Sequence, residues 1–382
     1  MRGMSAADFL TRALTLESSF VEALHGSVTH ESPTGVVPEG NAFVTLLHDR
    51  LHADGWSVDR LPRDEIADVL RATLPGSDPD DGTLILAHSD TVWPLGTLEE
   101  MPWRVEDGVA YGPGVLDMKA GIEAARFAAR LAREAGPLRG PTTLLVTSDE
   151  ERGSVHSKEL IEAEARRHAR VLVVEMGRDD GALKVARKGV GVLHVAFQGV
   201  SAHAGNEPER GASALAEAAR FLLAAEALAD PERGTTVAVT VASGGTVGNV
   251  IPERARCEID VRVLEDSEGA RVVEALHRYA PHDPRVRVTV EGGMNRPPME
   301  ATPANRALAD EAHAHLAAMG RSLEGAVVGG GSDGNFTSAL GVATLDGLGA
   351  VGSGPHARHE QVRIVETLER IALLAALLRG PD

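Results

Sequence analysis

His88 and Asp90 are the first residues in this chain whose types and spacing suggest chemistry, because they stand at the end of an apolar run. Residues 84–87 are typical of a buried strand that opens into a loop at its polar end. Open α/β sheets bind their ligands at such strand mouths. A carboxylate two residues from an imidazole can fix the tautomer of a metal-ligating histidine. An ordinary hydrogen-bonded pair would have the same spacing, so the pair alone does not establish a metal site.

Further apolar runs also end in acidic side chains. The run TTLLVT leads into Asp149, Glu150 and Glu151, and the run RVLVV leads into Glu175. A solvated loop could hold three consecutive acids, but a bound cation would relieve their mutual repulsion. Several strands in series that each deliver an imidazole or a carboxylate therefore indicate a metal site.

Asp117 ends a glycine-containing loop, directly before a predicted helix over residues 122–133. The glycines at positions 112 and 114 permit backbone conformations that most residues rarely adopt. A hairpin turn is expected earlier in the loop, at residues 106–108. An aspartate in front of a helix can be an N-cap or a ligand, and its position leaves both roles open.

Two packing helices precede the His88 strand. Apolar positions at helical spacing predict a helix over residues 5–25 that ends at Gly26, and a second helix that ends near Gly55. The segment 61–74 fits either a strand or a short helix.

Beyond residue 183 the sequence becomes rich in strands. Four strands and two helices, around residues 212–228 and 265–279, indicate a four-stranded antiparallel sheet covered by two helices. Because a helical pattern returns at Pro303, this α+β unit is expected to be an insertion. The prediction is an α/β protein of two domains: a domain with a mixed central sheet flanked by helices, residues 1–187 and 301–382, and an inserted domain, residues 188–300.

The composition limits the class of protein. With 382 residues, 43% of them hydrophobic and 25% charged, the chain is long enough for two globular domains. The formal net charge of −18 would repel nucleic acid and anionic membranes, so neither is an expected partner. No apolar signal segment stands near the N-terminus, which predicts a cytoplasmic protein. Cys257 is the only cysteine, so a metal here must take histidine and carboxylate ligands.

Seven motifs occur together in the chain: HSDTV, YGPGVLDMKAG, TSDEERGS, VVEMG, SAHAG, GNVIP and GPHARHE. In order and approximate spacing they resemble the two-zinc exopeptidases and deacylases that include glutamate carboxypeptidase, acetylornithine deacetylase and succinyl-diaminopimelate desuccinylase. The resemblance extends from His88 to Glu360. The loop YGPG is nearest to the glutamate carboxypeptidase branch. A lysine of that branch has no counterpart here unless Lys184 replaces it.

The resemblance implies a centre of two zinc ions, with cobalt or manganese as alternatives, that clamps a water molecule and the substrate carbonyl. Asp117 would bridge the ions. The remaining ligands would be His88 and Glu175 for one ion, and Glu151 and His356 for the other.

The resemblance also implies roles for the residues around the metals. Glu150 would be the general base that activates water and then protonates the leaving amine. Asp90 would support His88. His203 would stabilise the oxyanion and reach the active site of a partner subunit from the inserted domain, which acts as a lid and dimerisation domain. Without the resemblance, His203 would be interpreted as a surface histidine.

Substrate binding is assigned in the same way. Arg262 and Asn249 match lid positions that engage the substrate carboxylate and nearby backbone, and an arginine pairs well with a carboxylate. A salt bridge on an outward strand face is the alternative for Arg262. His194, His313 and His315 match nothing in the family.

The expected activity is zinc-dependent hydrolysis of an amide bond next to a free carboxylate, with a small molecule or peptide as substrate and a homodimer as the assembly. One alternative is an N-acyl amino acid deacylase. The other is a binding protein that has kept the fold and lost the chemistry.

Overall fold

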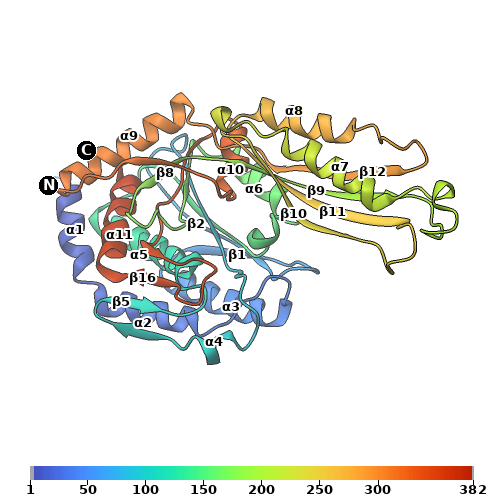
Figure 1. Ribbon diagram of the computed structural model, residues 1–382. Coiled ribbons are helices and arrows are strands. Elements are labelled where there is room, and N and C mark those ends of the chain that lie inside the picture. The colour runs from blue at the N-terminus through green and yellow to red at the C-terminus, as the bar shows by residue number, and fades with distance from the viewer. Residues whose placement is uncertain (1–3, 381–382) are drawn as a thin grey trace. The chain divides into compact units, whose positions relative to one another are not determined.

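The computed structural model describes residues 4–380, which fold into two compact units (Figure 1). The first unit contains the chain up to Ala186, Ala301–Val327 and the chain from Ser332 onward. The second contains Arg187–Glu300 and Val328–Gly331. The segment predicted to be inserted, 188–300, lies in the second unit, which also takes Val328–Gly331 from the glycine-rich run near the C-terminus.

A six-stranded mixed sheet forms the centre of the first unit, in the order β1-β2-β6-β3-β7-β14. The neighbours β6, β3, β7 and β14 are parallel, and β2 is antiparallel to both β6 and β1. The prediction of a mixed central sheet is therefore confirmed. Its strands are β1 (Ser57–Leu61), β2 (Val69–Leu74), β3 (Thr83–His88), β6 (Thr142–Thr147), β7 (Arg170–Val173) and β14 (Ala343–Leu345).

Helices cover both faces of this sheet because apolar side chains alternate along its strands. In β3, Ile85 and Ala87 belong to the larger core, whereas Leu84 and Leu86 belong to a smaller core on the other face. α6 (Lys158–Ala165) and α10 (Gly334–Ala339) contribute to the smaller core. The helices of the larger core are α1 (Ala6–Leu14), α2 (Glu17–Val28), α3 (Val37–Ala53), α5 (Ala120–Ala135), α9 (Pro303–Ala318) and α11 (Ile364–Arg379).

A small antiparallel sheet, β15-β16-β5-β4, connects two loops of the first unit. One loop follows β5 and leads to Asp117, and the other lies between β15 and β16 and contains His356. The turn between β4 and β5 is the predicted hairpin. The elements of this region are β4 (Arg104–Glu106), β5 (Val109–Tyr111), β15 (Gly352–Ser353), β16 (Gln361–Arg363) and the short helix α4 (Thr97–Glu100); β8 (Leu183–Arg187) pairs separately with β13 (Gly325–Val328).

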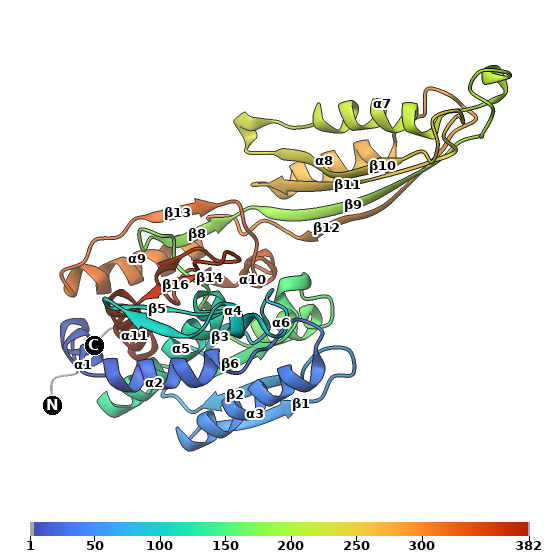
Figure 2. The same cartoon turned by 60° about the horizontal axis from the view of Figure 1, so that its bottom comes forward.

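The second unit is the predicted four-stranded antiparallel sheet with two helices, in the order β10-β11-β9-β12. Both helices lie on one face of the sheet (Figure 2). Phe197 and Phe221 pack against each other in the core between the sheet and the helices. The opposite face carries the polar members of the alternating strands. The elements are β9 (Gly189–Gln198), α7 (Ala214–Glu226), β10 (Thr236–Gly244), β11 (Arg254–Val263), α8 (Asp266–His277) and β12 (Arg287–Arg296).

The prediction of one N-terminal helix ending at Gly26 is wrong. The helix is interrupted between α1 and α2, and Gly26 lies inside α2. A Cβ at Gly26 would clash with the guanidinium of Arg50, which reaches across to Ser27 and Glu123. Gly26 therefore makes room for an ion-pair network, and it does not end the helix. Across residues 4–380, no helix has the length and apolar character needed to cross a membrane.

Candidate metal centre

Parallel strands bring the predicted ligands to one edge of the central sheet. β3 lies between β6 and β7, so the carboxyl ends of all three strands meet there. His88 is the last residue of β3. Glu151 lies in the short 3-10 helix Glu150–Arg152 that follows β6, and Glu175 comes two residues after β7.

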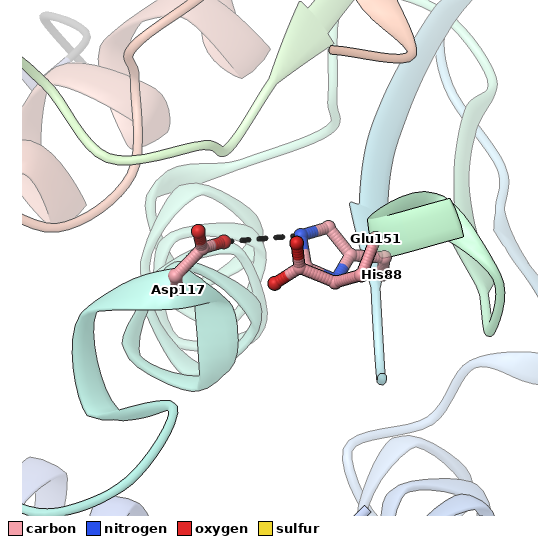
Figure 3. A group of neighbouring side chains, drawn as sticks. All are labelled: His88, Asp117 and Glu151. Atoms are coloured by element: carbon pink, nitrogen blue, oxygen red, sulfur yellow. Dashed lines mark hydrogen bonds and ion pairs between the residues drawn. The ribbon is translucent and has the colours of Figure 1, made fainter. Parts of the chain in front are cut away.

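Asp117 faces two histidines with its two carboxylate oxygens. Its Oδ1 lies 3.2 Å from Nε2 of His88, and its Oδ2 lies 3.1 Å from Nε2 of His356. Figure 3 shows the carboxylate pointing toward the His88 ring from the turn that precedes α5. Asp117 has φ −117° and ψ 93°, and its peptide bond to Met118 is cis. Asp117 is not the N-cap of α5, because that position is Lys119.

A glutamate completes each half of the arrangement. Oε1 of Glu175 lies 3.3 Å from Nε2 of His88, and Oε2 of Glu151 lies 3.3 Å from Nε2 of His356. The five predicted ligands are thus together in the first unit. They form two imidazole–carboxylate pairs that share the carboxylate of Asp117.

The pKa shifts in this cluster indicate that its carboxylates have too few positive partners. Hydrogen bonds to Asp117 and Glu151 raise the pKa of His356 to about 10. Burial acts against protonation of His88, yet its contacts with Asp117, Asp90 and Glu175 still raise the pKa of this histidine. Burial raises the pKa of Glu151 to about 7. The two histidines and Glu151 therefore hold protons more tightly than they do in water, and a cation could replace these protons.

The donor set fits divalent cations. The ligand atoms of His88, Asp117 and Glu151 all lie within 4.8 Å of one another. Oε1 of Glu151 is buried and has no hydrogen-bond partner among residues 4–380, so a cation would satisfy it. Nδ1 of His88 donates to the backbone carbonyl of Asp90 at 2.9 Å, which directs Nε2 at the carboxylates. Imidazole and carboxylate are ligands that suit Zn²⁺.

Asp90 is buried beside His88 and holds the loop after β6. The backbone carbonyl of Asp90 is the nearest partner of His88 Nδ1, whereas its Oδ1 lies 3.4 Å from this nitrogen. The Asp90 carboxylate accepts hydrogen bonds from the N–H groups of Glu150 and Glu151, each at 3.2 Å, and from Oγ1 of Thr34 at 2.7 Å. Asp90 therefore orients both the histidine and the two glutamates.

Glu150 lies beside the ligands without belonging to the two pairs around Asp117. Its carboxylate comes within 4.8 Å of ligand atoms of His88 and Glu175. Asp149, the first of the three acids, turns the other way and accepts hydrogen bonds from the N–H of His156 at 2.7 Å and the hydroxyl of Ser157 at 2.5 Å. Asp149 thus secures the loop, and Glu150 and Glu151 face the centre.

His203 and Asn249 lie together in the second unit. Nδ1 of His203 accepts hydrogen bonds from the N–H groups of Gly205 and Asn206, at 3.1 Å and 3.0 Å. The proton of the neutral ring must therefore sit on Nε2, which is left to donate. The N–H of Ala204 donates to the carbonyl of Asn249 at 2.9 Å, so the loops that carry the two predicted residues form a hydrogen-bonded loop pair.

Arg262 stands on β11 and pairs with Asp260 on the same strand face. Its Nε lies 2.8 Å from Oδ1 of Asp260, and its Nη2 lies 2.8 Å from Oδ2. The salt bridge named as the alternative for this residue is thus present. Arg262 lies near the C-terminal end of β11, whereas Asn249 precedes its N-terminal end, and the strand from Arg254 to Arg262 spans roughly 26 Å at 3.3 Å per residue. No small substrate can touch both residues of one chain.

Several residues outside the predicted ligand set have other surroundings. Nζ of Lys184 lies 3.5 Å from the sulfur of Met176. His194 pairs with Glu258 at 3.4 Å on the polar face of the second sheet. His313 and His315 lie on α9.

The sequence interpretation missed Glu360, which closes the motif GPHARHE. Glu360 is buried, and its carboxylate accepts hydrogen bonds from Trp93 Nε1 at 2.7 Å and from the N–H of Asp117 at 3.1 Å. The only signal was its place inside a motif of the resemblance. Spacing could not connect it to Asp117, which lies 243 residues earlier.

The family model for peptidase family M20/M25/M40 matches residues 84–380. The chain therefore belongs to this family and is a metallohydrolase, and the resemblance found in its motifs is confirmed.

Its similarity extends to characterised relatives and to solved structures. Carboxypeptidase G2 of Pseudomonas sp. (strain RS-16) is 31% identical over 300 residues, which cover 77% of this chain and 72% of the relative. Succinyl-diaminopimelate desuccinylase of Acidiphilium cryptum is 29% identical over 351 residues, 87% of this chain and 91% of the relative. The crystal structure of aminopeptidase PepT from Bacillus cereus superimposes with a TM-score of 0.80 at 24% identity, covering 95% and 98% of the two chains, which establishes the fold.

Proposed function

We propose that this protein is a two-zinc hydrolase that cleaves an amide bond next to a free carboxylate, in the manner of a glutamate carboxypeptidase. The observation that carries the proposal is the position of Asp117, whose two oxygens each face a separate histidine–glutamate pair. A single structural ion pair does not need this symmetry. A two-cation clamp does, because one carboxylate must serve both ions.

His88 and Glu175 would hold one cation, and His356 and Glu151 the other, with Asp117 between them. Nitrogen and oxygen ligands suit zinc, and cobalt or manganese could occupy the same positions. Two such cations, when bound, polarise a carbonyl oxygen and lower the pKa of a water molecule.

Glu150 would move the proton. Its carboxylate lies near the ligand atoms, and its loop is held by the hydrogen bond from its N–H to Asp90. Glu150 would take a proton from the attacking water and then deliver it to the leaving amine. His203 would donate its Nε2 proton to the developing oxyanion, as the hydrogen bonds to its Nδ1 favour.

We further propose a cytoplasmic homodimer in which two copies share each active site. Arg262 and Asn249 of one chain are too far apart to hold one substrate, whereas His203 and Asn249 belong to one loop pair. Arg262 from one copy and the loop pair from the other could act on the same molecule. The single cysteine, buried Cys257, fits a reducing compartment.

The substrate carboxylate would bind to the Nη edge of the Arg262 guanidinium, where Nη1 lies 3.5 Å from the Gly329 carbonyl, since Asp260 occupies the other edge. An N-acyl amino acid deacylase is the second candidate, and it is favoured by the alignment with the desuccinylase of Acidiphilium cryptum, which covers more of the chain than that with carboxypeptidase G2.

Amino acid release from a substrate panel tests the proposal. One series varies the C-terminal amino acid on a fixed blocking group, and a second varies the acyl group on a fixed glutamate, each with and without a chelator. We expect chelator-sensitive release concentrated on C-terminal glutamate or aspartate. Release governed by the acyl group would assign the protein to the deacylases, and no release with two zinc ions bound would refute the proposal.

A further inference from the structure

Glu360 joins three ligand-bearing loops through one buried carboxylate. Its Oε2 accepts hydrogen bonds from Trp93 Nε1 at 2.7 Å and from the N–H of Gly114 at 3.0 Å. Its Oε1 accepts from the N–H groups of Leu116 at 2.8 Å and Asp117 at 3.1 Å. Both oxygens are thus used, and every donor belongs to a segment next to a predicted ligand.

The three segments come from distant parts of the sequence. Trp93 lies in the loop that follows His88 at the end of β3. Gly114 to Asp117 form the turn before α5. Glu360 itself ends the turn that begins at Ala357, the residue after His356, because the N–H of Glu360 donates to the carbonyl of Ala357 at 2.9 Å.

We propose that Glu360 is a positioning residue of the metal centre, which fixes the Asp117 carboxylate between His88 and His356. This inference rests on the proposed two-cation function. Asp117 must satisfy two ligand sets at once, so a displacement toward one histidine is a displacement away from the other. A carboxylate that accepts the N–H of Asp117 itself, and that of Leu116 beside it, holds the backbone from which the shared ligand projects.

A glutamine at this position has the same shape but cannot accept all four bonds. Its amide NH₂ would point a donor at one pair of N–H donors, and the loops would have to separate there. Supporting residues of metal ligands typically change metal affinity by 10- to 100-fold. We therefore expect Glu360→Gln to weaken cation binding by roughly this factor.

The experiment is a Co²⁺ titration of the full-length protein, followed by calorimetry and by the visible absorption of the bound cobalt. Glu360→Gln should weaken binding and alter the cobalt spectrum, which reports ligand geometry. Glu217→Gln is the matched control. Glu217 is likewise buried and accepts an aromatic side-chain donor, Tyr279, and the N–H groups of His282 and Asp283, but it belongs to the second unit, whereas every predicted ligand belongs to the first. The control should leave affinity and spectrum unchanged.

A second variant keeps the test decisive if Glu360→Gln does not fold. Trp93→Phe removes one of the four donors from a half-buried side chain and should weaken cobalt binding a few-fold, with a smaller spectral change. Wild-type affinity and spectrum in Glu360→Gln, or in Trp93→Phe where the first variant is unfolded, would overturn the positioning role alone. A wild-type protein that bound fewer than two cations would instead refute the proposed function and, with it, the role of Glu360.

Discussion

Replacing Glu150 by glutamine should abolish proton transfer and leave the metals in place. The side chain keeps its size, and the backbone N–H of residue 150 still donates to Asp90, so the loop after β6 should keep its conformation. Glu151, its neighbour, faces His356 at 3.3 Å and serves the opposite purpose in the proposal. The two adjacent glutamates thus provide a matched pair for separating catalysis from metal binding.

The expected size of the effect follows from the position of Glu150. Its carboxylate lies within 4.8 Å of ligand atoms of His88 and Glu175, so a water molecule beside those ligands is within proton-transfer reach. Loss of a general base or acid typically lowers the rate about 10²- to 10⁴-fold, which corresponds to about 2.7–5.4 kcal/mol of transition-state stabilisation. Cation affinity should change by less than about threefold.

The assay combines kcat on the best substrate of the panel with calorimetric titration of zinc into each metal-free variant. Glu150→Gln should show the rate loss with two zinc ions still bound, whereas Glu151→Gln should lose affinity for one of them. If Glu150→Gln lost zinc in proportion to its activity, Glu150 would be a ligand and the base would have to be sought elsewhere. A rate within a factor of about five of the wild type would refute any role in proton transfer.

Three further predictions concern the same centre. Asp117→Asn leaves one acceptor oxygen where two are needed, so the second cation should bind at least about tenfold more weakly in calorimetry; equal affinities would contradict the bridging role. His203→Ala should lower kcat about 10²- to 10³-fold, and mixing it with Glu150→Gln should restore activity if the histidine acts across the dimer, whereas a mixture as inactive as its parts would place the histidine in its own subunit. In the metal-free protein, the raised pKa values of Glu151 (about 7, against 4.5) and His356 (about 10, against 6.5) mean that these two groups bind more protons in the folded state than in the unfolded state between those limits. Stability in urea should therefore fall as the pH rises from about 5 to 7, below the range in which buried Lys119, with its pKa lowered to about 7, acts in the opposite sense. Saturating zinc should remove this fall, and stability that rose over the range in the metal-free protein would contradict the arrangement.

The central fold could be predicted because the spacing of apolar residues along a strand indicates which of its faces are covered. β3 alternates between two cores, and its neighbours read as apolar runs because helices cover both faces of the sheet. Gly26 misled the prediction because a glycine can serve either to end a helix or to admit a neighbour. Only the tertiary contact with Arg50 shows that the second reason applies.

Strand ends indicated His88, Glu151 and Glu175 as candidate ligands, and the resemblance added Asp117 and His356, but the groups that hold these residues could not be predicted. His88 and Glu175 follow apolar runs directly, so their place at one sheet edge follows from parallel strand order. Glu360 follows no strand and reaches Asp117 only through the folding of two distant loops. Burial of an acid that accepts four hydrogen bonds is a property of the assembled loops, and local sequence does not encode it.

The geometry of the second unit links the fold to the proposed dimer. β11 separates Arg262 from Asn249 by its own length, and the antiparallel pairing with β9 places the His203 loop beyond the same end as Asn249. A residue that binds the substrate carboxylate and a residue that stabilises the oxyanion must both lie within a few ångströms of one small molecule. The strand cannot bend enough to bring its two ends together, because β9 and β10 hold it on both sides. In the proposed function both residues act, so they would come from different copies of the chain, and the length of one strand would then make dimerisation a requirement of catalysis.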